Sequence, residues 1–193
     1  MLFCRKRLLV YRFVGNTTPE SRPDMDLEVA YATRENIQRL FRGDRKRQSV
    51  FLRFLDKGYR GVIIHNSRQW LNYGWMSSPA ASGPPHVPFS VRRRSAYWLF
   101  YGHTAPEARG RGLHRYSMLL RVKSAFAEAR DPDIYTDTVA GNAVSRRGIL
   151  LVGFEPKGMI DTCEICIPGV RSWVWGTWDM HADHPEMDGG TGR

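Results

Sequence analysis

Cysteines and long apolar runs are both scarce in this sequence, and each scarcity excludes a class of protein. The three cysteines, Cys4, Cys163 and Cys166, form an odd and widely separated set in a chain of 193 residues. We therefore expect reduced thiols in a reducing compartment rather than a disulfide framework. No window approaches the roughly 18 apolar residues that span a bilayer, and the opening apolar run is too short for a signal peptide. We expect a cytoplasmic protein without a membrane segment.

Acidic side chains are outnumbered by basic ones, which gives a net charge of +10. Such a charge favours an anionic partner: a nucleic acid, a membrane surface or a phosphorylated small molecule. The basic residues are spread over several clusters rather than gathered in one stripe, so a nucleic acid is less favoured. The length and the 42% apolar content allow one domain, expected over residues 1–178. Residues 179–193 are polar, and we expect a flexible tail there.

Apolar periodicity predicts a chain of strands and helices. The strongest single signal is a helix over 113–129, whose apolar residues fall on one broad face. Strands are expected at 27–32, 61–65, 70–75, 96–101, 133–139, 159–167 and 172–178, further helices at 35–41, 49–55 and 143–151, and a long loop at 79–88. This order predicts an α/β fold with a mixed sheet and helices on both faces.

The most informative segment joins the strand at 96–101 to the long helix. It reads Arg-Gly-Arg-Gly over 109–112, directly before Leu113 and His114. The first N–H groups of a helix lack intrahelical partners and lie at the positive end of its dipole, so glycines there let an anion approach the backbone. The Walker pattern is not met because no Lys-Ser or Lys-Thr follows, and the dinucleotide fingerprint fails at Arg115. A phosphate-binding loop and an ordinary basic turn are both left open.

Two spaced motifs resemble the GNAT family of N-acetyltransferases. Arg109-x-x-Gly112-x-His114 is similar to the family's acyl-CoA signature, from which it departs by ending on histidine in place of glycine or alanine. Further on, Asn142 precedes a Gly-Phe pair at 153–154 by the interval that family members show. The resemblance implies a GNAT-like, mostly antiparallel mixed sheet with helices on both faces. It also implies an acyl-CoA-dependent N-acyltransferase that moves acetyl from acetyl-CoA to a primary amine by direct attack.

The resemblance also implies which residues hold the co-substrate. Residues 101–104 would diverge from the neighbouring strand, so that their backbone groups bind the pantetheine arm and polarise the thioester carbonyl. The pyrophosphate would lie on the glycine loop at the helix start. The expected contacts to acetyl-CoA are made by Thr104, Arg109, Gly110, Arg111, Gly112, Leu113, His114 and Asn142.

Catalytic residues match the family less well than the cofactor loop does. The glutamate that often serves as general base has no counterpart over 95–106, where His103 is the best local substitute because an imidazole titrates near neutrality. The family's tyrosine acid is replaced by Ile149, and Ser145, one turn earlier, is the candidate partner of the leaving thiolate. A packing role for His103, and helix-capping roles for Asn142 and Ser145, are the alternatives.

These departures keep a second class of protein open, a catalytically degenerate CoA-binding module. A basic nucleic-acid-binding protein is a third, less favoured class. The acceptor amine belongs to a small molecule or a protein, and three successive arginines at 92–94 give a weak preference for an anionic acceptor. Trp173, Trp175 and Trp178 alternate loosely along the last strand. Packing in the core or in a homodimer interface is favoured for them over lining an acceptor pocket.

A zinc site is the remaining motif to weigh. Cys163-x-x-Cys166 and His181-x-x-His184 offer ligands of the right kind. The cysteines, however, lie in a strand-like run where alternate side chains point to opposite faces, and the histidines belong to the acidic tail. No metal is therefore predicted.

Overall fold

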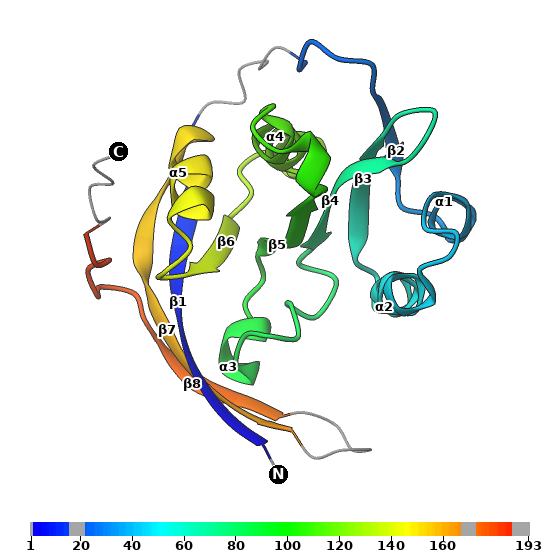
Figure 1. Ribbon diagram of the computed structural model, residues 1–193. Coiled ribbons are helices and arrows are strands. Elements are labelled where there is room, and N and C mark those ends of the chain that lie inside the picture. The colour runs from blue at the N-terminus through cyan, green and yellow to red at the C-terminus, as the bar shows by residue number, and fades with distance from the viewer. Residues whose placement is uncertain (1, 16–21, 167–172, 187–193) are drawn as a thin grey trace.

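The computed structural model describes residues 2–15, 22–166 and 173–186, which form one mixed sheet with helices on both faces (Figure 1). The strand order is β2-β3-β4-β5-β6-β1-β7-β8, with β5 and β6 parallel and the other neighbours antiparallel. The strands are β1 (Leu2–Phe13), β2 (Glu28–Tyr31), β3 (Arg60–His65), β4 (Trp70–Ser77), β5 (Tyr97–Thr104), β6 (Ile134–Val139), β7 (Phe154–Cys166) and β8 (Trp173–Asp179). The helices are α1 (Arg34–Leu40), α2 (Arg45–Asp56), α3 (Phe89–Arg92), the 3₁₀ turn η1 (Pro106–Ala108), α4 (Leu113–Phe126) and α5 (Ala143–Leu151). The predicted fold class is confirmed, and none of these helices is long and apolar enough to cross a membrane.

Each face of the sheet has its own helical cover, because side chains alternate between the faces along a strand. One face packs against α1, α2 and α3 around the fully buried Phe51 and Trp75, and we call it the α1–α3 face. The other packs against α4 and α5 around Leu99, Val122 and Ile149, and we call it the α4–α5 face. The sheet therefore separates two layers, and a ligand that reaches from one layer to the other must pass between strands.

The sequence patterns miss β1 and the single-turn helix α3. β1 lies between β6 and β7, and the middle of the strand is fully covered, since Leu9 and Val10 have no exposed surface. The first half of β1 is charged instead, and Arg7 pairs with Asp161 of β7 at 2.8 Å. A strand that is charged at one end, and apolar on both faces at its other end, shows no regular alternation of polar and apolar residues. Its partner β7 also comes from the far end of the sequence, so no local hairpin signal marks it.

Residues that follow β8 contact the fold. His184 Nε2 lies 2.8 Å from the carbonyl oxygen of Gly158, and the ring packs edge-on against Tyr11 at 4.7 Å. Arg146 of α5 donates to the carbonyl oxygen of Pro185. Within the predicted flexible tail, His184 and Pro185 therefore contact the sheet and α5, while 187–193 are outside the described residues.

Candidate functional site

β5 and β6 separate partway along their length. Their parallel pairing ends at Leu99 on β5 and Thr136 on β6. Beyond this point Tyr101 adopts a φ of 51°, and the register between β4 and β5 shifts, which marks a β-bulge. A bulge bends its strand and increases the local twist, so β5 follows β4 and leaves β6. The divergence that the resemblance implies for residues 101–104 is present.

A cavity of about 190 Å³ occupies this gap on the α4–α5 face. Its walls come from β5, β6, α4 and α5, and they include Gly102, His114, Asn142 and Ser145. The fold thus brings His114 of α4 together with Asn142 and Ser145, two predicted site residues at the start of α5. The hydroxyl of Thr104, by contrast, is engaged within the sheet, where it accepts a hydrogen bond from Asn72 Nδ2 at 2.8 Å.

The glycine loop ends at the N-terminus of α4, as the sequence predicts. Gly110 and Gly112 have φ values of 75° and 73°, the left-handed region that residues with a β-carbon disfavour. Gly112 is the N-cap residue, and no side chain in the described part of the chain caps the helix. Arg109 and Arg111 are exposed beside it, whereas Leu113 is buried and anchors the loop in the core. A helix start without a side-chain cap, its positive dipole end and two cations together suit an anionic ligand.

The histidine that ends the signature occupies a space made by two glycines. A β-carbon placed at Gly102 of β5 would lie 3.0 Å from His114 Cε1, and one at Gly148 of α5 would lie 3.6 Å from His114 Cδ2. The imidazole therefore sits across the gap between β5 and α5. Burial, and then the positive charge of Arg121, lower the pKa of His114 to about 4, so the ring is neutral at neutral pH. The sequence predicts that His114 contacts acetyl-CoA, but it does not predict that the ring lies between β5 and α5.

A buried arginine behind the bulge is a residue that the sequence reasoning misses. Arg121 of α4 donates to the carbonyl oxygens of Trp75, at 2.9 Å, and Ser117, at 3.1 Å. Its guanidinium packs against Gly74, where any β-carbon would collide with it. Burial lowers the pKa of Arg121 to about 9, and within the described chain no carboxylate forms an ion pair with it. The only sequence signal is a charge within the apolar stretch of α4.

Asn142 and Ser145 form a hydrogen bond at the start of α5. The side-chain oxygen of Asn142 accepts the backbone N–H of Ser145 at 3.1 Å, which is an N-cap bond. The capping alternative is therefore confirmed for Asn142, although both residues also line the cavity. Ile149, one turn later in the same wall, is 1% exposed and offers no hydroxyl where the family has its tyrosine.

His103 lies on the other side of the sheet. Its ring is stacked on Tyr73 at 5.7 Å and lies 5.9 Å from Trp70, both on β4. Burial, followed by the positive charges of Arg47 and Arg109, lowers the pKa of His103. The structure thus separates the two predicted catalytic residues, because His103 faces α1 and α2 while Ser145 lines the cavity on the α4–α5 face.

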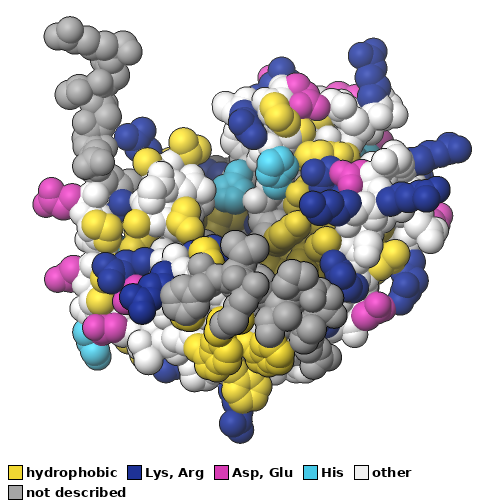
Figure 2. Space-filling view, turned by 60° about the horizontal axis from the view of Figure 1, so that its bottom comes forward, with side chains coloured by type: hydrophobic (Ala, Val, Ile, Leu, Met, Phe, Trp, Pro, Cys, Tyr) yellow, Lys and Arg dark blue, Asp and Glu magenta, His cyan; other side chains and the backbone are white. Residues whose placement is uncertain are grey.

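A histidine and an aspartate that the sequence reasoning does not consider meet on the α1–α3 face. His86 Nε2 lies 2.9 Å from Oδ2 of Asp137, and the same carboxylate accepts the indole N–H of Trp98 at 2.6 Å. His86 comes from the loop at 79–88, whose prolines and small residues indicate only a long connection. In Figure 2, histidine side chains lie beside a hollow lined by hydrophobic side chains, and Lys and Arg side chains crowd the neighbouring surface of α1 and α2.

The three successive arginines at 92–94 take part in the packing. Arg92 bonds to loop carbonyls, Arg93 lies over Phe89, and Arg94 lies 4.6 Å from the ring centre of Trp178. All three arginines therefore have structural contacts, which weakens the case for an anionic acceptor at 92–94.

The cysteines and histidines of the two C-x-x-C and H-x-x-H motifs do not form a cluster of three or more potential metal ligands in the described ranges, and the side chain of Cys166 lies outside them.

No family model matches the chain, and no curated protein matches it in sequence. Its fold does match solved structures. A GNAT-family acetyltransferase from Colwellia psychrerythraea gives a TM-score of 0.54 at 13% identity, over 81% of this chain and 54% of that one. A Novosphingobium aromaticivorans protein assigned to the same family gives 0.57 at 15% identity, over 90% and 66% of the two chains. A Drosophila protein gives 0.58 at 12% identity, over 88% and 54%.

The chain therefore spans between about half and two thirds of the length of these structures. At such identities the likeness concerns the fold alone. This fold is that of the GNAT acetyltransferases, as the spaced motifs predict.

Proposed function

We propose that this chain is an acyl-CoA-dependent N-acyltransferase that transfers an acyl group, acetyl in the first instance, to a primary amine. The proposal rests on one observation, namely that two structural features lie next to each other. A gap opens between β5 and β6, and it adjoins the glycine-flanked N-terminus of α4, which no described side chain caps. A thioester on a long arm with a pyrophosphate needs both a groove for the arm and a site for the anion.

The residues around the loop fit this co-substrate. Apart from the adjoining residues, no described atom lies within 4 Å of where a β-carbon would stand at Gly110 or Gly112, so no other part of the described chain packs on that side of the two glycines. Arg109 and Arg111 add charge-assisted hydrogen bonds to phosphate oxygens, while Thr104 and Asn142 flank the path of the arm. When bound, acetyl-CoA supplies the activated acyl group. The protein then binds and orients it, and it shields the reacting carbonyl from water.

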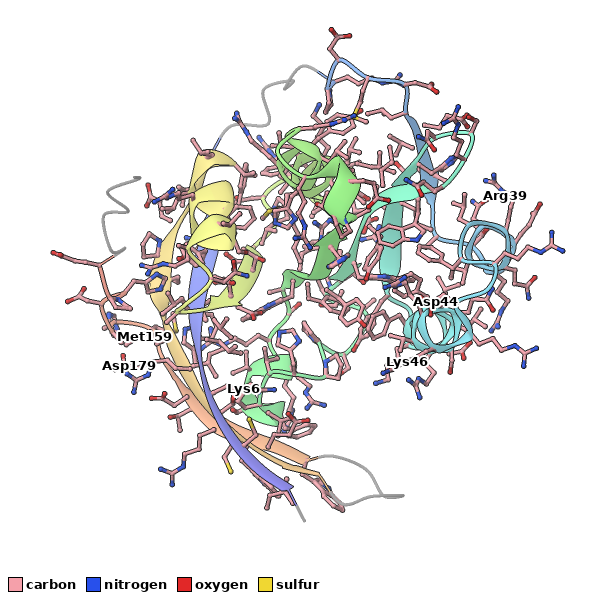
Figure 3. All side chains as sticks on the ribbon, viewed as in Figure 1. Lys6, Arg39, Asp44, Lys46, Met159 and Asp179 are labelled. Atoms are coloured by element: carbon pink, nitrogen blue, oxygen red, sulfur yellow. The ribbon has the colours of Figure 1, made fainter. Side chains whose placement is uncertain are left out.

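The two substrates would approach from opposite faces. The co-substrate arm occupies the cavity on the α4–α5 face, which leaves the α1–α3 face to the amine of a small molecule or a protein. Aromatic side chains with one cation gather there, since Arg47 lies over Trp70 and Tyr73. In Figure 3, Lys6 of β1 lies apart from Arg39 of α1 and Lys46 of α2, so these cations do not share one part of the molecule. This spread favours a phosphorylated small molecule over a nucleic acid as the anionic partner.

A CoA-binding module without catalysis is the second candidate. It is favoured by the buried Ile149 at the position of the family's tyrosine, and by the separation of His103 from Ser145. Release of the CoA thiol from acetyl-CoA across a panel of amines distinguishes the two candidates, because the module would bind acetyl-CoA and release no thiol.

Binding is tested by thermal unfolding with and without acetyl-CoA. At a ligand concentration of about 100 times its Kd, binding adds roughly 2.7 kcal/mol to the free energy of unfolding, which raises the Tm of a chain of this length by roughly 5–10 °C. The double variant Arg109→Glu/Arg111→Glu is expected to lose this rise, because two carboxylates would face the pyrophosphate.

A matched variant separates this effect from a general change of charge. Arg39→Glu/Arg130→Glu alters the net charge by the same amount at two exposed positions outside the loop, and it is expected to keep the rise in Tm. An unchanged Tm for the folded wild-type protein at millimolar acetyl-CoA would contradict the proposed function. An equal rise in both double variants would place the cofactor elsewhere.

A further inference from the structure

The loop between β4 and α3 fixes the position of one histidine. Arg92 donates from Nε to the carbonyl oxygen of Val87 and from Nη2 to that of Pro85, both at 2.7 Å. Val87 itself is fully buried in the core of the α1–α3 face. His86 stands between these two anchored residues, so its backbone is held in place, while its side chain is 40% exposed and accessible to a substrate.

The imidazole of His86 is oriented by a carboxylate. Nε2 lies 2.9 Å and 3.1 Å from the two carboxylate oxygens of Asp137, whose side chain is 8% exposed. The indole N–H of Trp98 holds the same carboxylate from β5 at 2.6 Å. Because an ionised carboxylate only accepts hydrogen bonds, Nε2 carries the ring proton and Nδ1 keeps its lone pair. A histidine held in one tautomer by a carboxylate is a recurrent arrangement for a general base.

The pair stands where the two substrates of the proposed reaction would meet. Asp137 directly follows Thr136, the last residue of β6 that pairs with β5, and it contributes to the wall of the cavity. Its carboxylate points into the α1–α3 layer, where the ring of His86 lies 6.2 Å from that of Phe100. An acyl group that reaches through the gap from the α4–α5 face would therefore emerge beside this pair.

We infer that His86 accepts the proton of the attacking amine and that Asp137 is its positioning residue, an inference that rests on the proposed acyl transfer. The amine arrives as an ammonium ion, and His86 Nδ1 takes one proton, which later leaves to solvent. The freed electron pair on nitrogen forms the C–N bond at the thioester carbonyl carbon. As the C–S bond breaks, its electrons leave with the sulfur, which takes the surplus proton of the nitrogen. The products are the amide and the free thiol of CoA.

His103 is less suited to this step. Burial is the main cause of the lowered pKa of His103, and the positive charges of Arg47 and Arg109 lower it further. A proton on this ring would lie near both charges. Its ring stacks on Tyr73, and in the described part of the chain no carboxylate bonds to it. A proton on His86 is instead compensated by Asp137.

The test compares two kinds of acceptor. Thiol release from acetyl-CoA is measured near pH 7 with primary alkylamines, which are protonated there, and with hydroxylamine, which is largely neutral and needs no base before attack. General-base catalysis contributes roughly 10²–10⁴-fold, so His86→Gln is expected to lower kcat with the best alkylamine by about that factor. Turnover of hydroxylamine is expected to be nearly unchanged. Asp137→Asn should show the same selectivity with a smaller loss.

A matched histidine and a rival histidine complete the design. His181→Gln, at an exposed position after β8, is expected to leave both rates unchanged. An equal loss with both acceptors in His86→Gln would indicate a structural role and overturn the inference. A selective loss in His103→Gln in place of His86→Gln would overturn it too. A wild-type chain that binds acetyl-CoA yet releases no thiol with any amine contradicts the proposed acyl transfer itself, and with it the role of His86.

Discussion

Gly158→Ala is expected to lower the free energy of unfolding by about 3–5 kcal/mol. Gly158 adopts a φ of 82°, and a β-carbon there would overlap the carbonyl oxygen of Asp179 and lie 2.6 Å from Cα of Met180. Backbone atoms do not rotate away as the end of a side chain does. β7 and β8 would therefore have to separate beside the paired residues Met159 and Asp179, which are labelled close together in Figure 3.

Gly110→Ala is the matched control for this prediction. Gly110 has nearly the same φ, 75°, but no described atom lies within 4 Å of its added β-carbon. It is expected to cost only the conformational strain, roughly 1–2 kcal/mol. Urea denaturation of both variants therefore isolates the cost of the collision at Gly158. Equal stabilities for the two variants would mean that β7 and β8 do not approach this closely in solution.

The sequence predicts those parts of the fold whose signals are local. The apolar face of α4 repeats within a few residues, and the position of two glycines directly before this helix is visible in the sequence. β1 is different, because its burial depends on β6 and β7 on either side, and its charged first half hides this. Only the folded sheet shows that such a segment is a central strand.

The same distinction between local signals and contacts of distant segments explains which parts of the candidate site can be predicted from the sequence. The loop over 109–112 is readable because both its glycines and its place before a helix are local features. The ring of His114 is not, since its place depends on two glycines from other elements, Gly102 and Gly148. The contact between His86 and Asp137 depends on the course of a long loop across the sheet. A side chain whose neighbours come from distant segments has no signature in the sequence, and much of what gives this site its chemistry is of that kind.

His114→Asn is expected to make the protein less sensitive to acid. Burial and Arg121 lower the pKa of His114 from 6.5 to about 4 in the folded protein. As the pH falls below 6.5, the unfolded chain takes up a proton that the folded protein refuses until about pH 4. The unfolded state therefore binds more protons over this window, and the folded state loses stability as the pH falls through it. The loss due to His114 amounts to about 3 kcal/mol across the whole window.

Chemical denaturation at about pH 7.5 and about pH 4.5 measures this loss. Between them the wild-type protein is expected to lose about 2–3 kcal/mol more than His114→Asn. The lowered pKa values of His103 and His184, and the titration of carboxylates, are common to both proteins and cancel in the difference. An equal loss would mean that the imidazole is solvated and that Gly102 and Gly148 do not enclose it. A larger loss in the wild type means that the cavity wall offers a ligand a neutral ring nitrogen, and not a second cation beside Arg121.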